Sequence, residues 1–220
     1  MAEAVSYKQI GSRPVRPDGV DKVTGRAEFG GDVSLPNMIV GKILRSPHAH
    51  ARIKKIDITA ALALPGVHAV ITGDDFPGGG IAGEIDGEGG GTLSDQAKNV
   101  MARDKVLYHG HALAAVAAIS EKIADSALDA IEVEYEVLQP VLDLLGAIEP
   151  DSPLVDENNY TNLPEKPDLP SNVANVGNLA RGNLEEGFEL ADIIVEREYI
   201  CPMTHQGYIE PHSCLASVDE

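Results

Sequence analysis

The sequence contains one glycine-rich segment that could bind a phosphate. It covers residues 73–95 and includes two Gly-Gly-Gly runs. A phosphate-binding loop needs converging backbone amides together with a Lys and a Ser or Thr at fixed spacing. Here Gly89-Gly90-Gly91-Thr92 has no Lys, three acidic residues between positions 84 and 88 would repel a phosphate, and no helix follows where a dinucleotide fingerprint needs one. We therefore expect a long flexible loop rather than a nucleotide site.

The histidines are the next candidates, because they come in pairs. A metal site needs several ligands that converge on one point. His109 and His111 lie two positions apart, so on a strand both rings would face one side and could in principle chelate. No Cys or acidic residue close in sequence completes a ligand set. We expect loop or hydrogen-bonding histidines and keep a histidine-based metal site as an alternative; the pairs are His48 with His50, His109 with His111, and His205 with His212.

Nucleophilic catalysis has little support in the sequence. There is no Gly-x-Ser-x-Gly elbow, and Ser46-Pro47-His48 lacks a third orienting residue nearby. Cys201 and Cys214 lie in predicted strands with apolar neighbours, where Cys is usually inert packing. The acidic residues within 132–136 alternate with apolar ones, which is typical of a solvated strand face. The residue types alone thus assign no catalytic, cofactor-binding or metal-ligating residue.

Composition limits the class of protein. Of 220 residues, 43% are hydrophobic but only 4% aromatic, so a core must consist of Ala, Val, Ile and Leu. The net charge of -18, from 35 acidic and 17 basic residues, would repel nucleic acid and anionic lipid. Two cysteines without metal spacing favour a reduced, cytoplasmic protein. Because Met1–Arg16 has no apolar segment and no long apolar run follows, we expect neither a signal peptide nor a membrane span.

The hydrophobic pattern divides the chain into four regions. Residues 1–36 are polar and predict an extended N-terminal arm, and residues 37–148 alternate between strand and helix signals. Residues 149–181 are rich in Pro, Asn and acidic residues, which predicts an extended linker. Residues 182–220 begin a further domain. The expected fold class is α+β or α/β, with a mixed sheet and packed helices.

Within residues 37–148 the pattern predicts five strands and two helices. The strands are expected over 38–44, 53–58, 67–72, 113–119 and 131–137. Of these, 113–119 is apolar throughout and should be buried on both faces, whereas 131–137 should place its apolar residues inward. In 67–72, Val67, Ala69 and Ile71 should share one face. The helices are expected over 60–64 and 121–130, with Thr59 and Ser120 as their N-caps.

The last region predicts a short helix over 183–190, a strand from residue 193, and a strand pair or hairpin over 207–218. Strands at an open edge carry unpaired backbone groups and need a partner. The chain ends at Glu220, in the middle of this predicted sheet, and a natural domain rarely stops at such a point. We therefore expect the chain to be either a separately encoded subunit or a fragment of a longer one.

Several stretches, in order along nearly the whole chain, together resemble one family. Leu44-Arg45-Ser46-Pro47-His48-Ala49-His50-Ala51-Arg52-Ile53 is one of them, and Tyr108-His109-Gly110 followed by the apolar run 114–118 is another. The chain resembles the large, molybdenum-cofactor subunit of the xanthine dehydrogenase and aldehyde oxidase family. The other matching stretches are 16–27, 32–38, 63–67, 133–136, 182–188 with 191–192, 205–206 and 209–212.

The resemblance implies that residues 37–148 form an α/β hammerhead domain and that residues 182–220 begin the molybdopterin-binding domain. Members of the family hydroxylate N-heterocycles, aldehydes or purines with oxygen from water, or oxidise CO. Electrons pass from molybdenum through two [2Fe-2S] clusters, usually to FAD, on other domains or subunits. The implied partners are therefore a cofactor-bearing molybdenum-domain subunit, an iron–sulfur subunit and an FAD subunit.

The departures from the family define the expected role. The family's catalytic glutamate and its cofactor-binding segments would follow Glu220, so no site residue is carried over. We expect this chain alone to bind no molybdopterin and to show no turnover, and to serve as a structural and subunit-docking portion of the enzyme. At residues 110–114 the chain has Gly-His-Ala-Leu-Ala, where relatives commonly place a Gln or Glu and then a Pro. The alternative is a non-enzymatic acidic scaffold or adaptor with the hammerhead fold.

Overall fold

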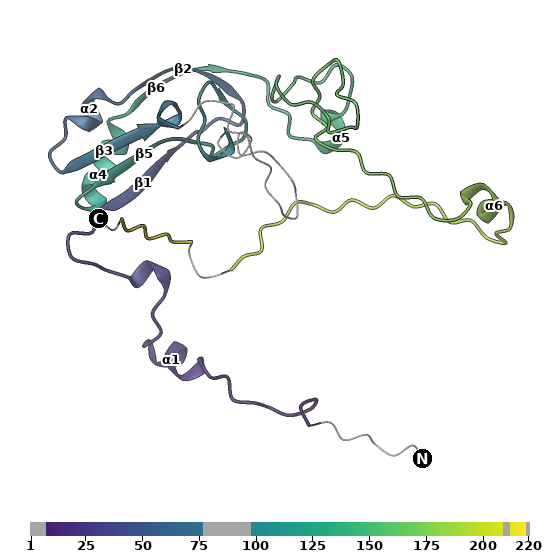
Figure 1. Ribbon diagram of the computed structural model, residues 1–220, viewed down its shortest axis with the longest axis horizontal. Coiled ribbons are helices and arrows are strands. Elements are labelled where there is room, and N and C mark those ends of the chain that lie inside the picture. Colours follow the sequence, from purple (N-terminus) through teal and green to yellow (C-terminus); the bar gives the residue numbers. More distant parts are fainter. Residues whose placement is uncertain (1–7, 77–97, 209–211, 219–220) are drawn as a thin grey trace. The chain divides into compact units, whose positions relative to one another are not determined.

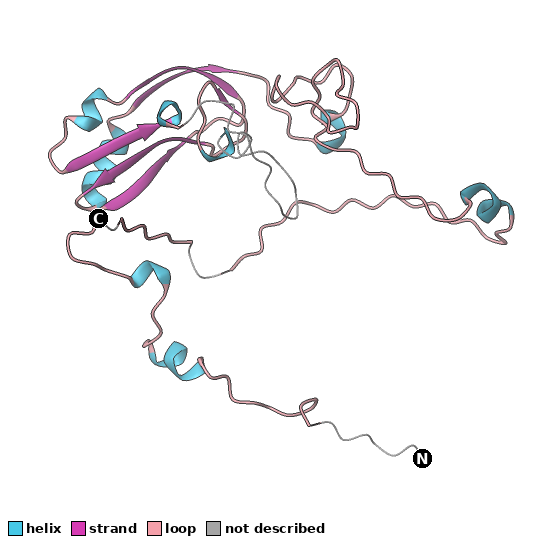
Figure 2. Ribbon diagram, viewed as in Figure 1, coloured by secondary structure: helices cyan, strands magenta, loops and turns pink. Residues whose placement is uncertain are grey.

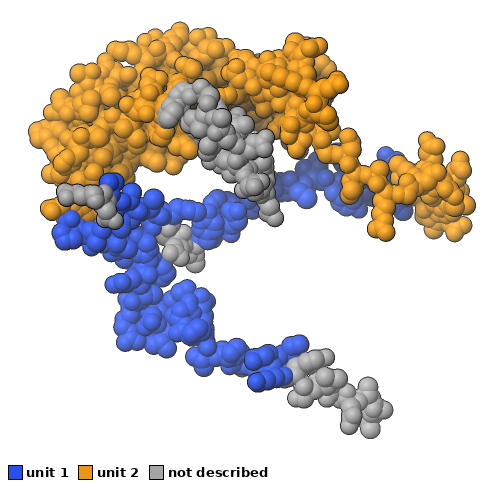
Figure 3. Space-filling model, in the orientation of Figure 1, with its two compact units in different colours: residues 1–36, 195–220 blue, residues 37–194 orange. Residues whose placement is uncertain are grey.

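The computed structural model of the protein describes residues 8–76, 98–208 and 212–218. It divides into two units, residues 37–194 and a second unit of residues 1–36 with 195–220 (Figure 3). Nearly all regular structure lies in the first unit (Figure 2). The expected glycine-rich loop therefore falls largely outside the described residues. Its first residues form a short 3-10 helix, η2 (Gly73–Asp75).

The first sheet has β5 (Ala112–Ala118) at its centre, between β1 (Val40–Arg45) and β3 (Val67–Thr72). Both neighbours run antiparallel to β5, with Ile43 and Ile71 each in register with Ala115. Five of the seven β5 residues are buried, which confirms the prediction of a strand covered on both faces. In β3 the buried residue is Val70. The face that carries Ala69 and Ile71 points away from the core.

The second sheet has β2 (Ala51–Asp57) at its centre, between β4 (Lys105–Val106) and β6 (Glu132–Val137). In β6 Val133 and Tyr135 are half-buried and the glutamates are exposed, as the alternation predicts. Val137, at the end of the strand, is 62% exposed, so the inward position predicted for it is wrong. The two-residue β4 was not predicted, because Lys105–Val106 is too short to show a period. It nevertheless brings Lys105 beside Arg52 in the sheet register.

The helices explain why this fold needs few aromatic residues. α4 (Glu121–Asp129) packs on β1 and β5 and also contacts α2 (Thr59–Leu62) (Figure 1). Its buried residues are Ala124 and Ala127, with no exposed surface. Because an Ala side chain is a single methyl group, the helix can approach an Ala- and Val-rich strand closely and still fill the space between them. The resulting core cluster consists of Ala61, Val70, Ala114, Val116, Ala118, Ala124, Ala127 and Ile131.

The structure confirms one of the two predicted helix N-caps and contradicts the other. Ser120 is the N-cap of α4, and its hydroxyl accepts a hydrogen bond from the Ile123 N–H, as predicted. The prediction of Thr59 as N-cap of α2 is wrong. Thr59 is the first helical residue, and its N–H donates to the Asp57 carboxylate at 3.0 Å. Asp57 thus accepts the hydrogen bond of the first helical amide, and the helix begins one residue earlier than predicted.

The expected mixed sheet is replaced by two antiparallel sheets. Each helix connects strands that belong to different sheets: α2 lies between β2 and β3, and α4 between β5 and β6. Parallel neighbours arise when a helical crossover returns the chain to the same sheet. Here neither crossover does so, and every pairing between these strands is antiparallel. The mixed α and β class is confirmed.

The strands predicted after residue 193 are absent from the structure in residues 191–208 and 212–218. Helix α6 (Leu184–Glu189) does form, capped by Asn183. The segment that follows exposes large apolar side chains, among them Ile193, Ile200 and Met203. A strand is stable only when its backbone pairs and its apolar face is covered, and nothing among the described residues covers these side chains.

Earlier in the chain, the arm forms α1 (Gly19–Thr24), which ends at Gly25 in the left-handed conformation.

The remaining short helices are α5 (Leu144–Ala147), in the first unit, and the 3-10 helix η1 (Gly30–Asp32), in the arm. Among the residues that the structure describes, none of the helices is long and apolar enough to cross a membrane.

Candidate functional site

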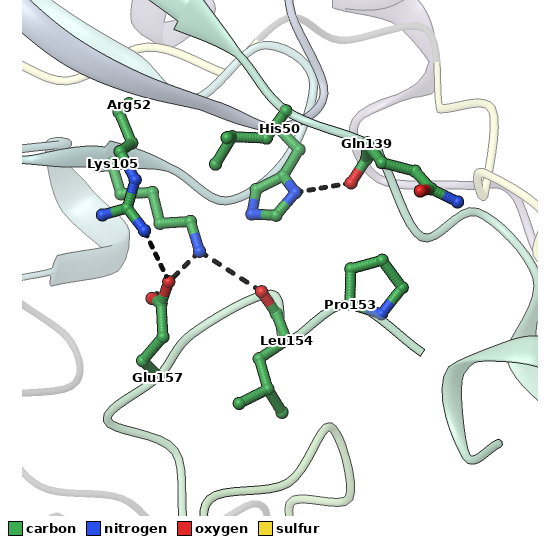
Figure 4. Close-up of a pocket in the computed structure, with 8 residues that line it drawn as sticks. His50, Arg52, Lys105, Gln139, Pro153, Leu154 and Glu157 are labelled. Carbon is green, nitrogen blue, oxygen red and sulfur yellow. Dashed lines mark hydrogen bonds and ion pairs between the residues drawn. The ribbon is translucent and has the colours of Figure 1, made fainter. Parts of the chain in front are cut away.

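A pocket of about 330 Å³ lies at the edge of the second sheet. Four parts of the chain form it. Arg52 comes from the start of β2, His50 from the turn before it, and Lys105 from β4 (Figure 4). The opposite wall belongs to the segment after β6 and to the Pro-rich segment beyond it. The residues from these two segments are Leu138, Gln139, Pro153, Leu154 and Glu157.

The charged side chains of the pocket form a compact network. The Lys105 ammonium group donates to Glu157 Oε2 at 3.0 Å and to the Leu154 carbonyl at 3.2 Å. Arg52 donates to the other carboxylate oxygen of Glu157 at 3.0 Å. Burial alone would raise the pKa of Glu157, but the hydrogen bond from Lys105 and the nearby cations outweigh it, so the pKa is lowered. Glu157 is therefore an anion that fastens the Pro-rich segment to the sheet.

His50 is the most deeply buried polar residue of the pocket, with 4% of its surface exposed. Its Nδ1 atom lies 2.7 Å from the Gln139 carbonyl, and because a carbonyl can only accept, Nδ1 carries the hydrogen of this bond. The Nε2 atom is buried and has no hydrogen-bond partner among the described residues. Figure 4 shows this nitrogen on the side of the ring where Lys105 and Leu154 lie. An unpaired buried nitrogen is costly, so it marks a place where the pocket can bind something.

His111 is also fully buried, and its environment is different. Its Nδ1 accepts a hydrogen bond from the Leu107 N–H at 3.3 Å, and its Nε2 donates to the Lys98 carbonyl at 2.9 Å. Tyr108 stacks on the ring with a centroid distance of 4.4 Å. Burial lowers the pKa of His111, partly opposed by its hydrogen bond to Lys98. Both nitrogens are used, which confirms the hydrogen-bonding role predicted for this histidine.

The other paired histidines do not converge on a metal site. His109 is exposed, so the ring pair considered for chelation is not formed. The rings of His205 and His212 both lie against the Tyr208 ring, with centroid distances of 5.2 and 4.9 Å. Within residues 8–76, 98–208 and 212–218 there is no group of three or more His, Cys, Asp or Glu side chains that could hold a metal ion.

Ser46 and the two cysteines have different surroundings in the structure. Ser46 is buried, but its hydroxyl is engaged by the backbone of His48, as donor and as acceptor at 3.0 Å. It thus shapes the turn before β2. Cys201 and Cys214 are exposed and form no disulfide, so the prediction that they pack inertly in strands is wrong. Both cysteines are exposed because no described part of the chain covers the segment that carries them.

The Pro-rich segment, which carries one pocket wall, is less extended than predicted, since it folds back on itself. Asn172 holds it together: its side chain accepts from the Val155 N–H at 2.9 Å and donates to the carbonyls of Pro153 and Ala147 at 3.0 and 3.1 Å. Asn amides are suited to this role because each offers one acceptor and two donors. The only sequence signal for it is an Asn that follows shortly after Pro170, which is weak.

We expect replacement of Asn172 by Ala to loosen this segment without unfolding the sheets. Three hydrogen bonds are lost, at roughly 1 kcal/mol each, so the Val155 amide should exchange with solvent about 10- to 100-fold faster. Asn172→Asp keeps the acceptor for Val155 but loses both donors, so its effect should be intermediate. Hydrogen exchange followed by NMR gives the result, with the Val116 amide of β5 as an internal reference. Unchanged exchange at Val155 in the Ala variant would contradict the role of Asn172.

The residues of this chain can also be tested against the molybdenum cofactor that the resemblance implies. The described residues of the last region, 182–208 and 212–218, are all exposed and enclose no space. The pocket beside His50 is lined by the hammerhead strands and the Pro-rich segment, outside that region. The described residues of this chain therefore do not by themselves form a site for a pterin cofactor.

Comparison with known proteins gives the family. The family model for the aldehyde oxidase and xanthine dehydrogenase a/b hammerhead domain matches residues 24–139, and the model for the molybdopterin cofactor-binding domain matches residues 165–220. The chain is 35% identical over 202 residues to a probable xanthine dehydrogenase subunit from Bacillus subtilis, covering 92% of this chain and 24% of that protein. It is 32% identical to the nicotinate dehydrogenase large molybdopterin subunit of Eubacterium barkeri, covering 97% and 45%.

Solved structures agree with this assignment. Quinoline 2-oxidoreductase from Pseudomonas putida 86 matches 67% of this chain and 19% of its own, with 35% identity and a TM-score of 0.55. A CO dehydrogenase from Oligotropha carboxidovorans matches 66% and 17%, with 36% identity and a TM-score of 0.53. The chain thus spans less than half the length of these relatives, which are oxidoreductases, and a non-enzymatic scaffold is not favoured. The protein belongs to the aldehyde oxidase and xanthine dehydrogenase family of molybdenum hydroxylases.

Proposed function

We propose that this chain is the structural and subunit-docking part of a molybdenum hydroxylase large subunit, and that it is inactive alone. The observation that carries the proposal is the open segment after α6. It lies within the match to the molybdopterin cofactor-binding domain model, yet its apolar side chains are not covered by any described residue. Burying such side chains is favourable by about 25 cal/mol per Å², so the segment has a strong tendency to associate. The exposed set is Leu190, Ile193, Ile194, Val195, Tyr199, Ile200 and Met203.

The proposed partner is the rest of the cofactor domain, which would add the strands needed to complete this segment as a sheet. The relatives support this, since several are named as subunits of larger enzymes. We further propose that iron–sulfur clusters and FAD reside on other domains or subunits, and that the complex works in the cytoplasm. In the complex the reaction would insert oxygen from water into a heterocycle or aldehyde, or oxidise CO.

The experiment compares the chain alone with the chain co-expressed with a cofactor-bearing molybdenum domain and its iron–sulfur and FAD partners. Molar mass, molybdenum content and substrate oxidation are measured for both. We expect the isolated chain to lack molybdenum and turnover, and the co-expressed chain to purify in an active complex. A monodisperse, active monomer that carries molybdenum would overturn the proposal.

A pair of matched variants locates the docking segment. Ile200→Asp places a charge on the open segment, and burying an unpaired charge is strongly unfavourable, so co-purification should be lost. Ile10→Asp is the control, since Ile10 is exposed to a similar extent, 73% against 82%, and lies outside both family matches. Equal co-purification of both variants would contradict docking through this segment.

A further inference from the structure

We propose that the pocket beside His50 is a binding site for a carboxylate group. The first observation is the charge of its lining: Arg52 and Lys105 carry two positive charges and Glu157 one negative charge, which leaves an excess of one. This excess occurs in a chain with a net charge of -18. This excess attracts a carboxylate, and a fixed cationic site in an acidic protein favours small anions.

The second observation is the supply of hydrogen-bond donors. The Lys105 side chain is only 11% exposed, and its ammonium group has three N–H bonds, two of which are used by Leu154 and Glu157. Arg52 is half-exposed at the mouth and uses one N–H on Glu157. Arg and Lys side chains with free N–H bonds are the usual partners of carboxylates in proteins. The pocket therefore has donors at both its floor and its mouth.

The third observation is the buried Nε2 atom of His50, which no group of the described chain satisfies. We place the carboxylate between this atom and the Lys105 ammonium, where it would accept the third N–H of Lys105. Because Nδ1–H is already donated to Gln139, Nε2 can donate to the carboxylate only from a protonated ring, so the carboxylate would bind together with one proton. The apolar side of the ligand would lie against Leu138 and Pro153.

The carboxylate can belong to a small organic acid or to an Asp or Glu side chain of the partner domain. Acetate is the probe, and the His50 Nε2 resonance of the 15N-histidine-labelled full chain is the readout. We expect a saturable shift towards the protonated form with a dissociation constant of about 1–10 mM, since acetate has few atoms. Sodium chloride at the same ionic strength should produce no such shift.

Matched variants separate binding from charge screening. Arg52→Gln should weaken acetate binding by about tenfold through loss of a charge-assisted donor. Lys54→Gln is the control, because Lys54 lies on the same strand, is 51% exposed against 52% for Arg52, and does not line the pocket. Equal titrations in the Arg52 and Lys54 variants, or an equal response to chloride, would overturn the proposal.

The two sources are told apart in the co-purified complex. If a partner carboxylate fills the pocket, the His50 resonance is already at the protonated position and acetate has no further effect. If the ligand is a free acid, the complex responds to acetate as the isolated chain does. A complex in which His50 stays unprotonated and acetate has no effect would reject the site. Because the isolated chain is titrated first, this proposal can fail while the docking function stands, and the reverse.

Discussion

Replacing Leu113 with Ala is expected to lower the free energy of unfolding by about 2–5 kcal/mol, the cost of removing a large apolar side chain from a packed core. Leu113 lies in β5, has no exposed surface, and packs with Ala51, Ala102 and Val106. It is the largest of the fully buried residues in this cluster, so its replacement by Ala removes the most apolar volume there. The loss would be a large share of the roughly 5–15 kcal/mol that is typical of a domain. Urea unfolding followed by circular dichroism measures it.

Leu142→Ala is the control for this experiment, since it removes the same atoms from a side chain that is 82% exposed. It should change the free energy of unfolding by less than about 0.5 kcal/mol. Because Leu113 points from β5 towards residues of β2 and β4, its loss should also weaken the packing of the two sheets on each other. Similar stabilities for the two variants would show that Leu113 does not hold the sheets together.

The sequence was most informative where local patterns and burial agree. The apolar run that became β5 and the alternation that became β6 each show the pattern of a strand, and Ser120 stands directly before a helical pattern. Such signals depend on neighbours only a few residues apart. They can therefore be recognised without knowledge of the rest of the fold.

Predictions that depend on distant partners were weaker. The strands expected after residue 193 have the right composition, but a strand also needs another strand to pair with. The type of sheet was mispredicted for a related reason, since nothing local shows that α2 and α4 each connect two different sheets. β4 escaped notice because a pair of residues has no period.

The pocket could not have been predicted from spacing. Its charged residues are Arg52, Lys105 and Glu157, which lie far apart in sequence and meet only through sheet pairing and the fold-back of the Pro-rich segment. His50 was singled out as one of a pair with His48, and the structure shows that the pair is not a unit. His48 contacts the Tyr135 ring, whereas His50 faces the pocket.

His111 is expected to make the stability of the fold depend on pH. Its pKa in the folded protein is lowered by burial from the ordinary value of 6.5. The unfolded chain therefore binds a proton more readily than the folded one as the pH falls below about 6.5. The contribution is fully present above that pH and is lost as the pH falls towards the folded-state pKa, by at most about 1.4 kcal/mol per pH unit. Protonation would also set a new N–H on Nδ1 against the Leu107 N–H whose hydrogen bond Nδ1 now accepts.

The matched variant is His111→Gln. A Gln side chain can accept from the Leu107 N–H and donate to the Lys98 carbonyl, but it does not titrate. Unfolding measured from about pH 7.5 to 5, across the histidine range, should thus show a smaller loss of stability for the variant, and the difference isolates His111 from the other histidines. His111→Ala leaves two buried backbone groups unpaired as well as a cavity, so it should lose about 2–4 kcal/mol at every pH. Parallel pH profiles for the wild type and the Gln variant would contradict the argument, because they would mean that the buried ring binds its proton as readily in the folded chain as in the unfolded one.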